Sequence, residues 1–193
     1  MIGVIGIDTN VGKTVVSAIL TEALQGYYWK PIQCGLPKDS EWVGGKCVPE
    51  RYSFKTPCSP HLAARIEGVE IDLEALMPPL VPGPLIIEGV GGVMAPLTST
   101  KTFLDAAVRW NAEWVLVHRH YLGSLNHFLL TIEALQHRGI ALKGVAFNGD
   151  GDQETEKMLL NRARTQCIGR IGWQKNLTKQ FIRDTAEAWK QRL

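Results

Sequence analysis

Hydrophobic positions along the chain alternate between short continuous runs and more widely spaced, helix-like patterns. Continuous runs that fit buried strands lie near residues 2–6, 27–33, 84–88, 114–118, 142–147 and 168–171. Apolar residues recur every three or four positions after most of these runs, most clearly over 123–138 and 178–192, which predicts amphipathic helices. Strands of this kind that alternate with helices predict an α/β fold, in which a parallel sheet carries helices on both faces.

The length of the chain predicts a single domain over residues 1–193, because 193 residues suit one hydrophobic core. The sequence also shows no internal repeat and no domain boundary. The stretch 34–58 is rich in glycine, proline and charge and has little periodicity, so we expect a functional loop there. In parallel sheets ligands bind beyond the carboxyl ends of the strands. The ends of the predicted strands are therefore where chemistry is expected.

The first strand end carries the strongest motif. Residues 6–14 read Gly-Ile-Asp-Thr-Asn-Val-Gly-Lys-Thr and lead from an apolar strand into a helix. Backbone N–H groups and the positive end of a helix converge there on an anion, with Lys13 reaching the β- and γ-phosphates of ATP and Thr14 binding Mg²⁺. The usual spacing of such loops fails by one residue, since the glycine stands at 6 and position 7 is Ile. The alternative is a chance Gly-Lys-Thr at an ordinary helix start.

Three charged residues at other strand ends fit the same chemistry. Lys30 lies near the end of the second strand and is either a second cation beside the γ-phosphate or a solvated surface lysine. Glu88 leaves an apolar strand directly into the glycine-rich loop 89–92 and is either a magnesium ligand or a salt-bridged carboxylate. Asp39, in the loop after Gly35, completes the magnesium shell or is simply solvated.

Two further segments suit ligand binding without requiring it. Ser124 resembles a helix N-cap, and the free N–H groups of that helix start grip a carboxylate if they do more than cap the helix. Asn148 ends the fifth strand, where its amide either pairs with a purine edge or terminates the strand. His118 and His120 share one face of an extended segment, so a zinc pair has to be considered, but the sequence shows no third ligand nearby.

Composition narrows the class of partners. Lys and Arg number 21 against 19 Asp and Glu, a net charge of +2 without a dense basic stripe, so nucleic acid is not an expected partner. No apolar run approaches the roughly 20 residues that span a bilayer, and the chain enters a strand at once, so we expect neither a membrane partner nor a signal peptide. The four cysteines lack a C-x-x-C pair, which fits free thiols in a cytoplasmic protein.

Five ordered segments together resemble the dethiobiotin synthetase family, whose fold is P-loop NTPase-like. The family's phosphate loop is similar to residues 6–14, its Lys-Pro-x-x-Ser/Thr-Gly to residues 30–35, and its Glu-Gly-Ala-Gly-Gly to residues 88–92. Ser59-Pro-His-Leu-Ala-Ala64 and Leu122-Gly-Ser-Leu-Asn-His127 also have close counterparts. The chain departs from the family at Ile7, at Asn10 in place of a common Glu, at Cys34 in place of Ser or Thr, and at 171–173, which lack a proline.

The resemblance implies an ATP- and Mg²⁺-dependent ligase that closes a cyclic urea on 7,8-diaminononanoate with CO2 or bicarbonate, through a carbamate and its anhydride with phosphate. It implies a homodimer in which each site needs both subunits. The implied catalytic residues are Lys13, Lys30 and Thr9, and the implied metal ligands are Thr14, Asp39 and Glu88. The implied ATP contacts are Asp8, Asn10, Val11, Gly12, Lys13, Thr14, Val15, Asn148 and Gly172. The implied substrate contacts are Thr9, Lys30, Cys34, Gly91, Gly123, Ser124, Leu125 and Asn126, the last four across the dimer interface.

A rival hypothesis from another class is a nucleotide-switch ATPase that positions cargo or partner proteins. Such ATPases resemble this fold, but they carry an additional lysine early in the phosphate loop, where this chain has Asp8. The apolar stripe of the final helix, at 182, 186, 189 and 193, either binds a membrane or packs against the sheet.

Overall fold

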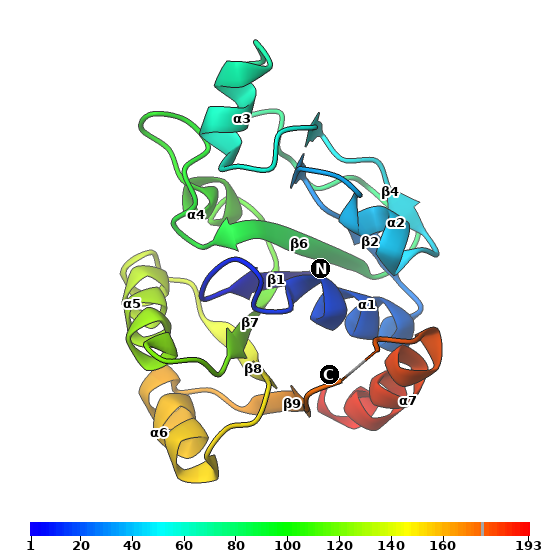
Figure 1. Cartoon of the computed structure of the whole chain (residues 1–193), viewed down its shortest axis with the longest axis vertical. Helices are drawn as coiled ribbons and strands as arrows, with labels where there is room; N and C mark the ends of the chain where they lie inside the picture. The colour runs from blue at the N-terminus through cyan, green and yellow to red at the C-terminus, as the bar shows by residue number, and fades with distance from the viewer. Residues whose placement is uncertain (175) are drawn as a thin grey trace.

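The centre of the computed structural model, which describes residues 1–174 and 176–193, is a seven-stranded sheet with the order β4-β2-β6-β1-β7-β8-β9 (Figure 1). Every pair of neighbouring strands is parallel. The strands are β1 (Ile2–Gly6), β2 (Tyr27–Trp29), β4 (Cys47–Val48), β6 (Leu85–Gly92), β7 (Glu113–Arg119), β8 (Leu142–Asn148) and β9 (Cys167–Ile171). A separate parallel pair joins β3 (Ile32–Cys34) to β5 (Tyr52–Phe54).

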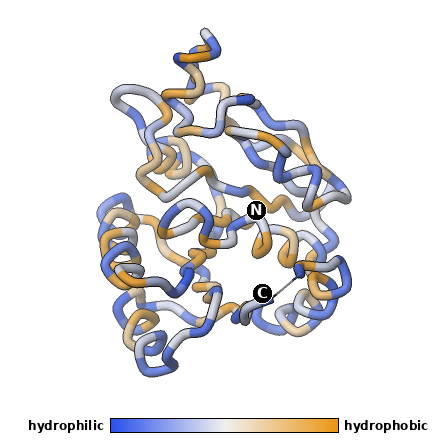
Figure 2. The backbone as a smooth tube through the Cα atoms, in the orientation of Figure 1, coloured by the Kyte–Doolittle hydropathy of each residue, from blue (hydrophilic) through white to orange (hydrophobic). Residues whose placement is uncertain are grey.

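Helices cover both faces of the large sheet, as the hydrophobic pattern predicts. The helices α1 (Lys13–Leu24) and α7 (Lys179–Trp189) pack against each other on one side, and α5 (Ser124–His137) and α6 (Gln153–Ala163) pack together on the other (Figure 1). Shorter helices are α2 (Asp39–Val43), α3 (Pro60–Ile66) and α4 (Phe103–Ala107), and a 3-10 turn, Lys190–Arg192, follows α7. Hydrophobic residues concentrate on the central strands (Figure 2). The α/β prediction is confirmed.

The central strand shows why the sequence folds this way. All five residues of β1 are buried, as expected of a strand covered on both faces. Gly3 is required there because a Cβ on it would lie 2.3 Å from the Trp114 ring. Trp114 belongs to a buried aromatic cluster in which the ring centroids of Phe103 and Trp110 are 5.6 Å apart. Glycine in β1 therefore lets a large aromatic core approach the strand that carries the phosphate loop.

Two expectations about residues 27–58 were wrong. The predicted strand 27–33 is two strands in different sheets, separated by Lys30 and Pro31. Proline has no N–H to donate to a ladder, and the Pro31 carbonyl instead accepts bonds from Arg51 and Tyr52. The predicted loop 34–58 contains α2, β4 and β5, elements so short that no periodicity reveals them.

The third difference concerns Glu88, which was expected to leave its strand into a flexible loop. Instead β6 continues to Gly92, because Gly92 pairs with Gly6 of β1 after a register shift. Glu88 therefore lies within a paired strand in the middle of the sheet, and its carboxylate is fixed in place.

The final helix packs on the protein. Trp189 and Ala186 are buried, and a Cβ on Gly169 of β9 would lie 2.0 Å from the Trp189 ring. The stripe therefore lies against the sheet, which was one of its two predicted positions. Within residues 1–174 and 176–193, no helix is long and apolar enough to cross a membrane.

Candidate active site

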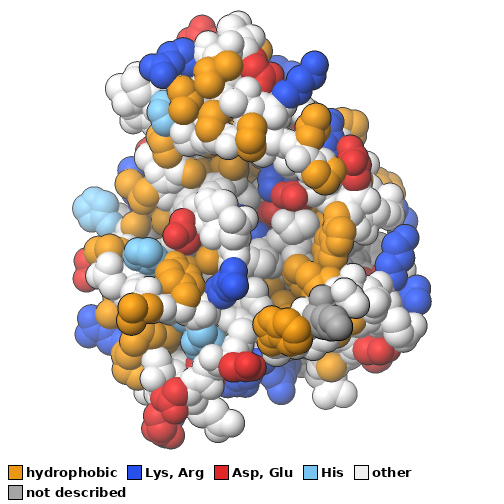
Figure 3. Space-filling model, in the orientation of Figure 1, with side chains coloured by type: hydrophobic (Ala, Val, Ile, Leu, Met, Phe, Trp, Pro, Cys, Tyr) orange, Lys and Arg blue, Asp and Glu red, His pale blue; other side chains and the backbone are white. Residues whose placement is uncertain are grey.

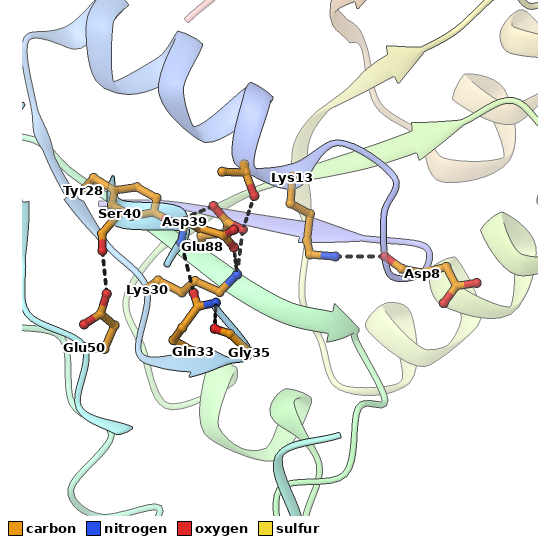
Figure 4. A network of polar contacts seen from close by, with 11 residues as sticks. Asp8, Lys13, Tyr28, Lys30, Gln33, Gly35, Asp39, Ser40, Glu50 and Glu88 are labelled. Carbon is orange, nitrogen blue, oxygen red and sulfur yellow. Dashed lines mark hydrogen bonds and ion pairs between the residues drawn. The ribbon is translucent and has the colours of Figure 1, made fainter. Parts of the chain in front are cut away.

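The phosphate loop connects β1 to the first residue of α1. Gly12 caps α1 with φ 100°, a left-handed conformation that favours glycine. Gly6 is equally constrained, since a Cβ there would lie 2.6 Å from a Val11 methyl group. Lys13 Nζ donates to the Asp8 carbonyl at 2.9 Å across the loop (Figure 4). Burial lowers the pKa of Lys13 to about 8, because the charged ammonium loses its hydration. A bound anion would offset this cost of burying the charge.

Beside the loop, Glu88 accepts three hydrogen bonds, from α1, from β2 and from the residue that directly follows β2. Its side chain is 1% exposed and accepts from the Thr14 hydroxyl at 2.9 Å, the Tyr28 hydroxyl at 2.7 Å and Lys30 Nζ at 3.1 Å. Lys30 also pairs with Asp39 at the start of α2 (Figure 4). A buried carboxylate is costly unless it is paired and hydrogen-bonded, and here both conditions hold.

The electrostatics of this cluster keep the Lys30 ammonium charged. Burial alone disfavours the charge, but the carboxylates of Glu88 and Asp39 outweigh burial and raise the pKa of Lys30. Burial, together with Glu88, also raises the pKa of Tyr28, so the phenol remains a donor. The two lysines of the site therefore have opposite pKa shifts, Lys13 downward and Lys30 upward.

Gln33 holds the geometry of Asp39. Its amide nitrogen donates to the Gly35 carbonyl at 3.0 Å, and its amide oxygen accepts the Asp39 N–H at 3.3 Å. Sequence reasoning missed both Gln33 and Tyr28. The only signal for them was that each lies within three positions of Lys30, in or at the end of a predicted strand.

A cavity of about 1170 Å³ joins the phosphate loop to this cluster. On the face drawn in Figure 3, charged side chains of both signs meet near the centre. Twelve of the expected site residues line the cavity: Asp8, Thr9, Asn10, Gly12, Lys13, Thr14, Val15, Lys30, Cys34, Asp39, Glu88 and Gly91. The structure thus brings together residues that are up to 83 positions apart in the chain, from 8 to 91.

Comparison with known proteins agrees with this geometry. The family model described as "AAA domain" matches residues 1–180. An ATP-dependent dethiobiotin synthetase from Nitrobacter hamburgensis is 42% identical, covering 94% of this chain and 90% of its own length. A second from Agrobacterium fabrum is 43% identical, covering 92% and 88%. The chain belongs to the dethiobiotin synthetase family.

Solved structures show the same fold at greater distance. MinD from Aquifex aeolicus superimposes with a TM-score of 0.55 at 15% identity, covering 97% of this chain and 94% of that one. A ParA family ATPase from Chlorobium tepidum gives 0.54 at 10% identity, covering 99% and 90%. These likenesses concern the architecture of the sheet and helices.

Two of the expected nucleotide residues outside the cavity, Val11 and Asn148, contact each other at the phosphate loop. Val11 is buried beneath it, and the Asn148 amide donates to the Val11 carbonyl at 2.8 Å. Asn148 therefore connects the end of β8 to the phosphate loop of this dethiobiotin synthetase family protein. Its side-chain nitrogen also faces Gly12 of that loop. Gly172 follows β9 and is exposed, and the neighbouring Trp173 side chain is 72% exposed.

The start of α5 departs from the expectation that Ser124 caps this helix. Gly123, with φ 93°, is the N-cap, and Ser124 is the first helical residue. The Ser124 side chain is buried and lies 3.4 Å from His118 Nε2. Gly123, Leu125 and Asn126 are exposed and lie outside the cavity. A glycine with positive φ caps the helix, which leaves the serine hydroxyl free to turn inward.

The two histidines considered as a zinc pair have other contacts. Their ring centroids lie 4.8 Å apart, but His120 Nε2 pairs with the buried Glu156 at 3.1 Å and His118 packs on Phe128. Burial lowers the pKa of His118 to about 4, so its ring is neutral. The described part of the chain contains no group of three His, Cys, Asp or Glu residues placed to hold a metal.

The residues expected to bind magnesium are hard oxygen donors, as that ion requires. The Thr14 hydroxyl and the Glu88 carboxylate are already 2.9 Å apart, and Asp39 is joined to Glu88 through the Lys30 ammonium. Two carboxylates that share the Lys30 ammonium lie beside a threonine hydroxyl. These oxygen atoms are suitable ligands for a divalent ion that is bound to phosphates.

Proposed function

We propose that this protein is an ATP-dependent dethiobiotin synthetase, a ligase that forms dethiobiotin from 7,8-diaminononanoate, CO2 and ATP. One amine of the substrate takes up CO2 as a carbamate, and a carbamate oxygen attacks the γ-phosphate of ATP. The second amine then closes the ring as phosphate leaves, and ADP remains. We further propose that residues 1–193 act as one ATP-binding ligase domain in the cytoplasm, where its four free thiols would stay reduced.

The convergence of Lys13, Lys30 and Glu88 on one cavity carries this proposal. Phosphoryl transfer is catalysed mainly by positioning and by neutralising charge. Lys13 would contact the β- and γ-phosphates, and Lys30, which is held as an ammonium, would neutralise the carbamate and the transferring phosphoryl group. Both side chains are buried, so water screens their charges little.

The same cavity is lined by oxygen ligands suited to magnesium. Thr14, Asp39 and Glu88 would hold it, and when bound it supplies positive charge to the oxygens of the β- and γ-phosphates. Tyr28 would then keep Glu88 in place, because its hydroxyl bonds Oε2 of the carboxylate, whereas Thr14 and Lys30 bond Oε1. Gln33 would do the same for Asp39 through the backbone of α2.

The substrate would occupy the rest of the cavity. Thr9 and Asn10 would lie close to the reacting amines, with Cys34 and Gly91 along the substrate. Gly91 approaches Thr9 closely, because a Cβ at 91 would lie 3.6 Å from the Thr9 hydroxyl. The carboxylate of the substrate would reach Gly123–Asn126 of a second subunit in a homodimer, since these residues do not line the cavity of their own chain.

The nucleotide would extend along the phosphate loop toward Asn148 and Gly172. The backbone of residues 8–15 would cradle the triphosphate at the start of α1, where the helix dipole favours negative charge. Asn148 donates to Val11 with its nitrogen, so its carbonyl oxygen is the atom available to an adenine amino group.

A direct assay tests the proposal. The protein is incubated with ATP, Mg²⁺, bicarbonate and 7,8-diaminononanoate, and dethiobiotin is sought by mass spectrometry alongside phosphate release. We expect dethiobiotin and phosphate in equal amounts, both dependent on the diamine. Phosphate release that ignores the diamine would contradict the proposal.

The rival switch function is tested by flotation with anionic liposomes in the presence of ATP. Asp8 stands where switch ATPases carry a lysine, and Trp189 of the final helix packs on Gly169 of the sheet. We therefore expect no ATP-dependent flotation. Robust binding would favour the switch.

A further inference from the structure

The cavity contains an imidazole that the chemistry above does not use. His127, the fourth residue of α5, lines the cavity together with Asp8, Thr9 and Lys13. Its Nδ1 lies 2.7 Å from the Tyr121 hydroxyl and 3.9 Å from Asp8 Oδ2. Within residues 1–174 and 176–193, its Nε2 has no hydrogen-bond partner. The ring is thus held in place through Nδ1, and Nε2 is available to a ligand in the cavity.

The neighbours of His127 decide which nitrogen carries the proton. If Tyr121 donated to Nδ1, the proton of the neutral ring would be on Nε2, and Nε2 could accept nothing. The Asp8 carboxylate beside Nδ1 favours a proton on Nδ1 instead, with the Tyr121 oxygen as its acceptor. Burial and the same carboxylate raise the pKa of Tyr121, so the phenol keeps its own proton. This arrangement leaves a lone pair on Nε2.

The proposed reaction needs such an acceptor. A neutral amine that adds to CO2 becomes a carbamate and releases one proton. Lys30 cannot take it, because two carboxylates hold it as an ammonium, and Lys13 is required in the charged form for phosphate binding. The Glu88 carboxylate already accepts three hydrogen bonds. Among the described residues that line the cavity, His127 is the only imidazole.

We propose that His127 Nε2 accepts the proton of the substrate amine as that amine adds to CO2; this rests on the proposed function. The amine lone pair forms the N–C bond, one C–O π pair moves onto oxygen to give the carbamate, and the N–H proton passes to Nε2. No electron is gained or lost. The imidazolium lies 3.9 Å from the Asp8 carboxylate and, with its side chain 42% exposed, returns the proton to solvent.

The location agrees with this role. Thr9, expected near the reacting amines, donates its N–H to Asp8 Oδ1 at 2.7 Å, so Asp8 connects that position to His127. The charged and titratable groups that face the ring are Asp8 from the phosphate loop and Tyr121 from the β7–α5 connection. Arg119 lies near them and donates to the Asn10 carbonyl at 3.2 Å.

Substitution with chemical rescue tests the proposal. In His127→Gln the side chain keeps polar atoms but cannot take up a proton, so we expect kcat for dethiobiotin to fall by about 100-fold or more. The KM for ATP should change less than about threefold, because no phosphate contact is lost. In His127→Ala, added imidazole should restore turnover in proportion to its concentration. His137→Gln, at the exposed end of the same helix, is the matched control and should retain wild-type rates.

Each outcome supports or overturns the assignment. Nucleotide binding by calorimetry shows whether both His127 variants are folded, and wild-type turnover shows whether the proposed function itself holds. If the wild type makes dethiobiotin and His127→Gln does so within about threefold of its rate, the assignment is wrong. It is also wrong if His127→Ala is slow but gains nothing from imidazole, since the ring would then only position its neighbours.

Discussion

At the scale of single residues, the site is defined by two lysines whose environments differ. Lys13 is buried beside a backbone carbonyl, and burial lowers its pKa to about 8. Lys30 is equally buried but lies between two carboxylates that raise its pKa. Without ligand, Lys13 therefore contacts a neutral carbonyl, whereas Lys30 is paired with two carboxylates that a ligand's anionic groups would have to replace.

The lowered pKa of Lys13 predicts that ATP affinity depends on pH. Without nucleotide, Lys13 loses its proton as the pH rises through about 8, whereas a bound triphosphate favours the ammonium. The dissociation constant for ATP should therefore rise between pH 7 and pH 9, by about tenfold at pH 9. Calorimetric titration measures it. Lys13→Arg, whose guanidinium stays charged, should show a flat profile; an unchanged slope would contradict the assignment to Lys13.

The contacts of Glu88 predict a metal effect. Glu88→Gln keeps the shape of the side chain but removes the charge, so the magnesium concentration for half-maximal activity should increase by about tenfold or more. Turnover at increasing Mg²⁺ measures this. The control is Glu50→Gln, since Glu50 pairs with Lys38 outside the cavity. An identical metal titration for Glu88→Gln and the wild type would reject the ligand role.

At the scale of elements, the hydrophobic pattern predicted the long strands and helices well. The buried runs at 2–6, 114–118 and 142–147 are strands, and the helices at 124–137 and 179–189 lie where apolar residues recur at helical spacing. The pattern failed between 27 and 58, because strands of two or three residues carry no period. It also missed the extension of β6, which depends on pairing with β1 rather than on local sequence.

The site could be predicted only as far as its motifs reached. The phosphate loop, Lys30 and Glu88 were found because each lies at or just after the end of an apolar run in the sequence. Tyr28 was missed because nothing local indicates that its hydroxyl meets a carboxylate 60 positions later. Gln33 was missed for the same reason, since it acts on Asp39 through the backbone. Such contacts depend on the register of strands, which one sequence does not specify.

The packing of α7 on β9 predicts a large loss of stability on truncation. Trp189 is buried against Gly169, so Trp189→Ala should reduce the free energy of unfolding by about 3–5 kcal/mol. Urea unfolding measures the change. Trp173→Ala is the matched control, because its side chain is 72% exposed and little should change. A loss below about 1 kcal/mol for Trp189→Ala would mean that α7 contributes little to the core.

At the scale of the whole molecule, the cavity of the chain contains the phosphate end of the proposed reaction, and residues at the start of α5 are exposed outside it. Leu122 is fully exposed next to Gly123, and Leu125 is 39% exposed. Exposed apolar residues beside an open helix start are suited to contact with a second copy of the chain. In the homodimer that we propose, each active site would then be formed by residues of both subunits.

Subunit mixing tests the shared site. Lys13→Ala should be inactive alone, and so should Asn126→Asp, which brings a negative charge to the proposed carboxylate site. Refolding the two in equal amounts forms mixed dimers in which one of two sites has both intact halves, so activity should return to about a quarter of wild type. Assays after co-refolding measure this. If activity does not return although mixed dimers form, each subunit contains its own complete site.

The position of the Lys30 ammonium between Glu88 and Asp39 affects the order in which ligands arrive. A free divalent ion has to compete for the two carboxylates with the Lys30 ammonium, which is covalently attached to the chain. The protein without nucleotide should therefore have little affinity for the divalent ion. A triphosphate offers Lys30 new anionic partners and thereby releases the two carboxylates. Metal and nucleotide are therefore expected to load together, as a preformed complex, rather than one after the other.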